Sequence, residues 1–209
     1  MSVSSFWGGS GLRLGIMGGA FDPVHMAHLV TAEEALVQFD LDHVVFMPAG
    51  DPPHKGPHLA PGEFRYLLVS VATASHPKFS VSRFEIDRVN VSYTVDTLEH
   101  YAGLLPDDAQ LFFITGADAA LDILTWKDPA RVLELATFIA ATRPGYDLSK
   151  LAGLLEELRS ATVGIVPEAR VKTMEVPDLA ISSSMIRERL AAGRAVRYLV
   201  PDAVAQLIE

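Results

Sequence analysis

Short apolar runs alternate along the chain with longer stretches of helical composition. Five apolar runs have the length of buried strands and predict strands at residues 12–17, 44–48, 111–115, 138–142 and 163–166. The stretches between them predict helices at residues 64–75, 95–104, 129–135 and 151–159. Strands and helices that take turns in this way predict right-handed βαβ units. The expected fold class is therefore α/β, with a doubly wound, mainly parallel sheet and helices on both faces.

One edge of this sheet is the expected place for a ligand. In open parallel sheets, ligands bind beyond the carboxyl ends of the strands, near the point where the strand order reverses. Four positions come at or just after the end of an apolar run: Gly18, Pro48, Gly116 and Arg143. We therefore expect these positions to share one crevice.

The chain has the length of a single domain. Its 209 residues, of which 49% are hydrophobic, can bury one substantial core, and no internal repeat or low-complexity linker divides them. The first residues are rich in Ser and Gly, which predicts a flexible leader over residues 1–11. We expect one domain over residues 12–209.

Charge and composition narrow the classes of partner. A net charge of -9 and a pI near 5.2 argue against a broad surface for nucleic acid or anionic membrane, so an anionic substrate must meet a local cluster. The chain has no cysteine, which removes disulfides, thiolate metal sites and thiol nucleophiles. No apolar run reaches the roughly 20 residues that span a bilayer. We expect a cytoplasmic protein, and the sequence leaves its oligomeric state open, including a homo-oligomer.

The segment Gly-Gly-Ala-Phe-Asp-Pro-Val-His-Met-Ala-His, which follows the first predicted strand, suits a nucleotide polyphosphate. Gly18 and Gly19 lack the Cβ atoms that would keep phosphates away from the main chain. Asp22 is the expected N-cap of a helix that begins at the following proline, with free N–H groups facing the glycine turn. On such a helix His25 and His28 lie on one face, about one turn apart, so both imidazoles can reach the same anion. Each feature taken alone is common in ordinary turns and helices.

The ordered combination resembles the Gly-Gly-x-Phe-Asp-Pro-x-His-x-Gly-His signature of the nucleotidyltransferase superfamily. Neither the dinucleotide-binding glycine fingerprint nor the Walker lysine loop has this spacing. Ala27 stands where that family usually has Gly, a change that a helix tolerates but that alters how closely a ligand can approach the backbone. The resemblance implies that His25 and His28 are catalytic donors to the triphosphate, and that ATP also contacts Gly18, Gly19, Phe21 and Asp22.

A Pro- and Gly-rich loop is predicted at residues 48–58. It contains Pro-Pro-His-Lys after a strand end, where a lysine can meet phosphate, although such a loop can also be an ordinary solvated turn. The loop resembles one in pyridine mononucleotide adenylyltransferases that approaches substrate phosphate. The resemblance implies a catalytic role for Lys55 and mononucleotide binding for His54.

The segment Ile-Ser-Ser-Ser-Met-Ile-Arg, at residues 181–187, opens a predicted helix near the other end of the chain. Serines at a helix start are commonly caps, but hydroxyls, free N–H groups and an arginine one turn later also make a phosphate cradle. The segment resembles the Ile-Ser-Ser-Thr-x-x-Arg motif of nucleotidyltransferases, with Ser184 in place of Thr. This implies that Arg187 is the catalytic arginine of the triphosphate site, and that ATP also contacts Ile181, Ser182, Ser183 and Ile186.

Two more segments resemble the bacterial nicotinate mononucleotide branch of that superfamily: Ser-Tyr-Thr-Val-Asp-Thr-Leu at residues 92–98, and Ile-Thr-Gly-Ala-Asp at 114–118 followed by Trp126. Without the resemblance, a capping Asp and a core Trp are the ordinary interpretations. With it, Gly116 and Asp118 are implied to bind ATP. Tyr93, Thr94, Trp126 and Arg143 are implied, with His54, to bind nicotinate mononucleotide.

Together these segments resemble nicotinate mononucleotide adenylyltransferases, of the actinobacterial type judging from residues 143–146. The resemblance implies a Rossmann-like fold and the reaction of ATP with nicotinate mononucleotide to give nicotinate adenine dinucleotide and pyrophosphate. Because the chain shows no obvious carboxylate cage, Mg²⁺ is expected to arrive with ATP, and no protein ligand is assigned to it.

Three alternatives stay open at this point. The first is a sister adenylyltransferase that uses nicotinamide mononucleotide or phosphopantetheine. The second is a metal-dependent hydrolase built on four histidines, His25, His28, His54 and His58, which lack a convincing ligand set. The third is a non-catalytic nucleotide sensor that binds ATP and releases no pyrophosphate.

Overall fold

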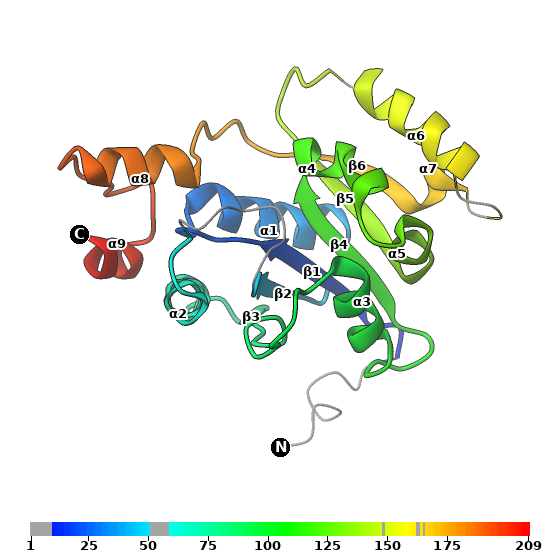
Figure 1. Ribbon diagram of the computed structural model, residues 1–209, viewed down its shortest axis with the longest axis horizontal. Helices are drawn as coiled ribbons and strands as arrows, with labels where there is room; N and C mark the ends of the chain where they lie inside the picture. Colours follow the sequence, from blue (N-terminus) through cyan, green and yellow to red (C-terminus); the bar gives the residue numbers. More distant parts are fainter. Residues whose placement is uncertain (1–9, 51–58, 148, 162–163, 165) are drawn as a thin grey trace.

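The computed structural model describes residues 10–50, 59–147, 149–161, 164 and 166–209, with a parallel sheet at its centre (Figure 1). The strand order is β3-β2-β1-β4-β5-β6, and every neighbouring pair is parallel. The strands are β1 (Arg13–Gly19), β2 (His43–Pro48), β3 (Phe79–Val81), β4 (Gln110–Gly116), β5 (Ala136–Thr142) and β6 (Val171–Glu175). The predicted α/β class and parallel sheet are confirmed.

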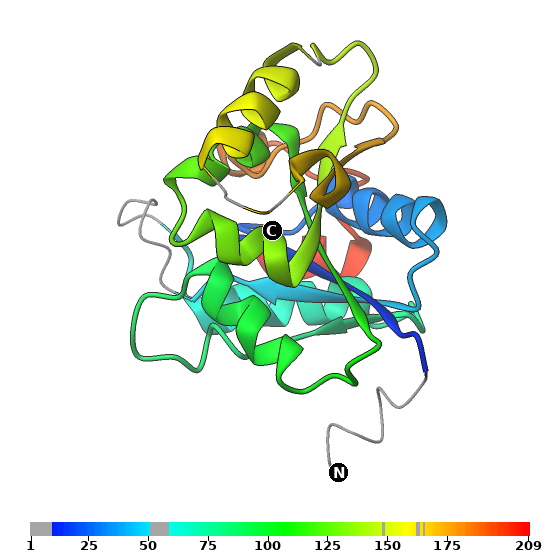
Figure 2. The same ribbon diagram turned by 90° about the vertical axis from the view of Figure 1, so that its right-hand side faces the viewer.

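Helices cover both faces of the sheet, as Figures 1 and 2 show. The face with the first core cluster carries α3 (Thr94–Ala102), α4 (Ala117–Leu121), the 3-10 turn η2 (Ile123–Thr125), α5 (Pro129–Leu135) and α6 (Ser149–Ala161). The other face carries α1 (Met26–Gln38), α2 (Gly62–Thr73), α8 (Ser183–Ala191) and α9 (Asp202–Ile208). The short α7 (Pro167–Arg170) precedes β6. No helix in the described ranges combines the length and the apolar character that crossing a membrane requires.

Strand β4 shows how the sequence builds two cores at once. Leu111 and Phe113 belong to one buried cluster, and Phe112 and Ile114 belong to the other. Successive side chains of a strand point to opposite faces, so a continuous apolar run is what a strand covered on both sides requires. The apolar runs along the chain therefore predict the central strands well.

The sheet edges are less well predicted. The strand expected at residues 163–166 is wrong where the structure describes it: Gly164 lies in a turn with φ +84°, and Val166 is 63% exposed just before the proline that opens α7. Residues 163 and 165 lie outside the described residues. The outer strand is instead β6, in which only Val171 and Met174 are buried, so it lacks the apolar run of a central strand. At the opposite edge, β3 has only three residues and was likewise not predicted.

Where the strand order reverses, the central strands β1 and β4 lie side by side. From β1 the chain continues to β2 on one side, whereas β4 is followed by β5 on the other. Such a switch point leaves a crevice at the carboxyl ends of the strands. Of the predicted leader, residues 1–9 lie outside the description, while Ser10 and Gly11 both donate hydrogen bonds to Asp108.

Candidate active site

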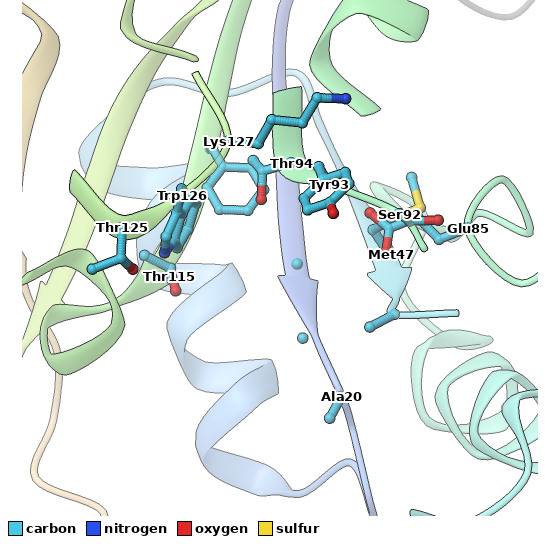
Figure 3. Close-up of a pocket in the computed structure, with 14 residues that line it drawn as sticks. Ala20, Met47, Glu85, Ser92, Tyr93, Thr94, Thr115, Thr125, Trp126 and Lys127 are labelled. Carbon is cyan, nitrogen blue, oxygen red and sulfur yellow. The ribbon is translucent and has the colours of Figure 1, made fainter. Parts of the chain in front are cut away.

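A cavity of about 590 Å³ opens at the carboxyl ends of β1, β2 and β4 (Figure 3). This volume is in the range of small-molecule sites. Its lining comes from the strand ends, from the start of α3 and from the segment after η2. The lining residues are Gly18, Gly19, Ala20, Met47, Ala49, Glu85, Ser92, Tyr93, Thr94, Phe113, Thr115, Thr125, Trp126 and Lys127.

The two glycines at the end of β1 are required by aromatic neighbours. A Cβ atom on Gly18 would lie 2.8 Å from the ring of Phe113, and one on Gly19 would lie 3.1 Å from the ring of Phe21. The carbonyl of Gly19 accepts a hydrogen bond of 2.8 Å from the N–H of Ala49, which joins the ends of β1 and β2. A larger residue at Gly18 would therefore clash with the ring of Phe113 unless that ring moved.

The histidine pair lies beside this glycine turn, in a local structure that differs from the expected one. Helix α1 begins at Met26 with His25 as its N-cap, so the predicted N-cap at Asp22 is wrong. The N–H of His25 donates to Nδ1 of His28 over 3.2 Å, and the two rings stack with centroids 3.7 Å apart. Asp22 does not cap the helix because its main chain and carboxylate face Arg187. The structure nevertheless brings the two imidazoles together.

His25 is held in an apolar setting. It is only 5% exposed, and its Nδ1 has no hydrogen-bond partner among the described residues. Burial lowers the pKa of His25 to about 4, so the ring is neutral at pH 7. His28 is half-buried, and the buried ring of Phe21 meets it edge-on at 5.0 Å. His25 and His28 are thus held together beside the glycine turn, with the ring of His25 almost fully enclosed.

The start of α8 docks onto the turn before α1. Nη1 of Arg187 donates to the Asp22 carbonyl over 2.6 Å and lies 3.6 Å from the Asp22 carboxylate. The hydroxyl of Ser183 donates to the Pro23 carbonyl over 3.0 Å, and Nη2 of Arg187 donates to the Ser184 hydroxyl over 3.2 Å. Segments about 160 residues apart thus form one cluster. We call it the anion corner: Asp22, His25, His28, Ser183 and Arg187.

The other predicted residues of this segment have different surroundings. Ser182 is the N-cap of α8 and accepts a hydrogen bond of 3.2 Å from the N–H of Met185. Ile186 is fully buried in the core, so a ligand can reach it only through its backbone. Ile181 is partly buried against the same core. The start of α8 is therefore stabilised both by the Ser182 cap and by packing of Ile186 in the core.

The pyridine side of the predicted site lines the cavity. Tyr93 is the N-cap of α3 and Thr94 is its first residue. Trp126 is half-buried and packs edge-on against Phe113 and Phe138, at centroid distances of 5.8 and 5.6 Å. Trp126 therefore belongs to the core on one side and to the cavity on the other. We call Tyr93 and Trp126 the aromatic wall.

Besides the anion corner and its neighbours, Gly116, Asp118 and Arg143 also lie outside the cavity lining. Gly116 ends β4 and is the N-cap of α4, and Asp118 is exposed in the first turn of that helix. Arg143 follows β5 and is also exposed. Of the four positions expected to share one crevice, only Gly18 is part of the lining; Pro48, Gly116 and Arg143 are not, although Met47, Ala49 and Thr115 are. His54, Lys55 and His58 lie outside the described residues.

The described part of the chain contains no group of three or more His, Cys, Asp or Glu side chains arranged to hold a metal ion. Among the four histidines of the hydrolase alternative, the described pair is His25 and His28, which stack on each other. The corner thus offers imidazoles and a guanidinium, which are groups that meet anions.

No role was predicted for Arg65, which lies on α2 and is only 1% exposed. Its guanidinium donates to four backbone carbonyls, at distances from 2.6 to 3.0 Å: those of Ala20, Ala49, Gly50 and Ala60. Each of these acceptors lies in a connection next to the cavity. A buried arginine satisfied in this way fixes the loops after β1 and β2 relative to each other.

Three lining residues were also not assigned a role from the sequence: Glu85, Ser92 and Lys127. Glu85 accepts a hydrogen bond of 2.6 Å from the Thr97 hydroxyl. Burial raises the pKa of Glu85, although its hydrogen bond with Thr97 opposes this shift. The hydroxyl oxygen of Ser92 is buried and has no hydrogen-bond partner among the described residues.

Comparisons with known proteins show which proteins this chain is similar to. A family model described as "Cytidylyltransferase-like" matches residues 16–189. A protein of Thermoanaerobacter sp. (strain X514), named "Probable nicotinate-nucleotide adenylyltransferase", is 46% identical over 199 residues, which are 95% of this chain and 92% of the relative. An actinobacterial protein of the same name, from Leifsonia xyli subsp. xyli (strain CTCB07), is 49% identical over 196 residues, or 94% of this chain and 90% of the relative.

Solved structures show the same fold. The "Plasmodium falciparum nicotinic acid mononucleotide adenylyltransferase complexed with NaAD" aligns with a TM-score of 0.71 at 18% identity and covers 94% of both chains. A putative nicotinate-nucleotide adenylyltransferase from Vibrio parahaemolyticus aligns with a TM-score of 0.63 at 18% identity, over 94% of this chain and 98% of the other. At these identities the likeness concerns the arrangement of the elements.

Proposed function

The chain belongs to the cytidylyltransferase-like family and, within it, to the nicotinate-nucleotide adenylyltransferases, and we propose that it carries out the reaction of that group. It transfers the adenylyl group of ATP to nicotinate mononucleotide and produces nicotinate adenine dinucleotide and pyrophosphate. The observation that carries this assignment is the anion corner standing beside a cavity with an aromatic wall. One part suits a triphosphate and the other suits a flat heterocycle.

The reaction requires no nucleophile from the protein. An oxygen of the mononucleotide phosphate forms a bond to the α-phosphorus of ATP while the bond to the β-phosphate breaks, and pyrophosphate leaves. The attacking phosphate is already ionised at neutral pH, so a strong general base is unnecessary. Catalysis then depends on positioning both anions in line and on stabilising the charge that develops on the leaving group.

Three side chains of the anion corner are proposed to meet the triphosphate. His25 and His28 donate to the triphosphate, and Arg187 supplies permanent positive charge because its guanidinium is fixed by the Asp22 carbonyl. The low pKa of His25 reflects its burial, and a polyanion placed beside the ring raises that pKa toward the charged form. Lys55, whose place in the chain follows the two prolines, is proposed to add a second permanent cation.

Magnesium is proposed to enter with ATP, where it neutralises phosphate charge and keeps water and phosphate oxygens as ligands. The imidazoles and the guanidinium of the anion corner are hydrogen-bond donors, so these side chains are proposed to contact the phosphate oxygens directly. The carboxylate of Asp22 lies 3.6 Å from Arg187, which already balances its charge. A cytoplasmic location suits a chain without cysteine that uses ATP.

The aromatic wall is proposed to receive the nicotinate ring. Trp126 is fixed by two aromatic neighbours, so it offers a rigid stacking surface at little entropic cost. Tyr93 and Thr94 form the start of α3, where backbone N–H groups and the helix dipole favour a negative group. A ring that carries a carboxylate fits both features.

The test is pyrophosphate release from Mg-ATP in parallel reactions with nicotinate mononucleotide, nicotinamide mononucleotide, phosphopantetheine or no acceptor. Release that is fastest with nicotinate mononucleotide supports the proposal. Release without any acceptor would indicate a hydrolase, and metal analysis of protein purified without an affinity tag would then identify its metal. No release despite measurable ATP binding would indicate a sensor.

A further inference from the structure

Two charged side chains line the cavity, and they lie on different sides of it (Figure 3). Lys127 follows Trp126 directly and extends over the ring of Tyr93. Glu85 lies near Met47 and Ser92, on the side away from Trp126. The cavity therefore has a lysine beside the aromatic wall and a glutamate on the side away from Trp126.

Two contacts hold Lys127 at the aromatic wall. Its Nζ lies 4.7 Å from the centroid of the Tyr93 ring, a distance at which a cation is attracted to the face of an aromatic ring. The same Nζ lies 3.0 Å from Oδ1 of Asp96, in the first turn of α3. Because the side chain of Lys127 is 51% exposed, substitution at this position leaves the core untouched.

Asp96 does not cancel the charge of Lys127 completely, because it is shared. Its Oδ2 lies 3.4 Å from Nη2 of Arg88, so one carboxylate stands between two cations. Arg88 is itself shared, because it also interacts electrostatically with Glu85, which accepts a hydrogen bond from the Thr97 hydroxyl. The charge that lies directly against the aromatic wall, over the Tyr93 ring, is the ammonium of Lys127.

We infer that Lys127 is a specificity-determining residue that favours a pyridine ring bearing a carboxylate over one bearing a carboxamide. This inference rests on the proposed function and adds to it the charge that the ring must carry. A carboxylate that enters the cavity loses part of its hydration, and a nearby cation offsets that cost. A neutral carboxamide gains nothing from the same cation. Lys127 acts through its field at the wall and needs no fixed contact with the substrate.

The experiment compares kcat/KM for nicotinate mononucleotide and for nicotinamide mononucleotide in the unaltered protein and in Lys127→Gln. We expect the ratio of the two values to fall about threefold to tenfold, which is the size of an electrostatic effect at a half-exposed site. Lys127→Arg should keep the ratio. Lys150→Gln, which removes an exposed lysine of α6 outside the cavity lining, is the matched control and should also keep it.

Salt supplies a second readout that packing alone would not change. In the unaltered protein the ratio should decline as ionic strength rises, whereas in Lys127→Gln it should be nearly independent of salt. An unchanged ratio in Lys127→Gln would overturn the inference. If kcat/KM fell equally for both substrates, the ratio would also be unchanged, and Lys127 would only support Tyr93. If the unaltered protein releases no pyrophosphate with nicotinate mononucleotide, the proposed function itself fails, and the two failures are thereby distinguished.

Discussion

The anion corner and the aromatic wall lie at the same edge of the sheet but are held by different forces. In the corner, Arg187 and Ser183 donate to main-chain carbonyls of a buried turn, and His25 is almost fully enclosed. At the wall, Trp126 is fixed by ring packing, whereas Lys127 is half-exposed and lies in a shared ion pair. In the proposed function, the backbone contacts of the corner hold the groups that meet the triphosphate. The side chains of the wall, which can change without disturbing the fold, are proposed to select the acceptor.

The largest effect is expected from breaking the corner at His28. His28→Ala should lower kcat about 100-fold to 1,000-fold, as is typical when one donor to developing charge is lost. The loss of its hydrogen bond with the His25 N–H should cost about 1 kcal/mol of stability at the start of α1, so the protein should remain folded. Steady-state kinetics and thermal unfolding measure the two effects separately.

The control for this variant is His76→Ala. His76 pairs with Glu33 and stacks on Phe79, away from the cavity lining, so its loss should leave turnover unchanged. A normal rate in His28→Ala would remove His28 from the proposed mechanism.

A second test of the corner is the pH dependence of stability. The pKa of His25 is lowered from 6.5 to about 4 by burial, so the unfolded state binds a proton that the folded state does not in this range. The contribution of His25 to the free energy of unfolding is therefore fully present above pH 6.5. It decreases by up to about 3 kcal/mol as the pH falls toward 4. Denaturant unfolding at several pH values should show this slope.

His25→Gln, which cannot titrate, should have a shallower slope than the unaltered protein. His43 also has its pKa lowered to about 4, mainly by burial, and contributes to the slope of both proteins equally. Identical slopes in the two proteins would contradict the environment described for His25.

A smaller loss of activity is expected from Arg187→Lys than from His28→Ala. Lysine keeps the charge but cannot reach the Asp22 carbonyl and the Ser184 hydroxyl with two separate nitrogens. We expect kcat/KM for ATP to fall about tenfold, the effect of losing one charge-assisted contact. The matched control is Arg189→Lys on the same helix, because the Arg189 side chain donates to the Ala195 carbonyl and not to the anion corner. Equal losses in both variants would indicate a general effect on α8.

The smallest of these effects tests the aromatic wall. Trp126→Ala should raise the KM for nicotinate mononucleotide about fivefold to tenfold, since aromatic stacking contributes about 1 kcal/mol. The KM for ATP should change little, because stacking concerns the pyridine ring. Trp126→Phe should recover most of the affinity. A pyridine KM that stays constant in Trp126→Ala would show that Trp126 is only a core residue.

The same contrast explains how far the sequence predicts the site. The motifs around Gly18 and Ser182 are readable because each binding group lies within a few residues of the next. The predicted N-cap of α1 was wrong because Asp22 contacts Arg187, about 160 residues away. A capping rule considers only neighbouring residues and does not anticipate such a contact. Arg65 was missed for the same reason, since its acceptors lie in loops that only the fold brings together.

The fold follows a similar rule. Central strands such as β4 were predicted because burial on both faces demands a continuous apolar run. The edge strand β6 has one neighbouring strand and two buried residues, so its pattern resembles that of a loop. Lys127 could be noticed only after the cavity was known, because its significance depends on Tyr93 and Asp96 from another segment.

In the proposed reaction an oxygen of the mononucleotide phosphate attacks the α-phosphorus of ATP. This step can be followed with nicotinate mononucleotide that carries heavy oxygen in its phosphate, by mass spectrometry of both products. We expect all of the label to stay in nicotinate adenine dinucleotide and the pyrophosphate to be unlabelled. Label in the pyrophosphate, or the absence of the dinucleotide, would rule this reaction out.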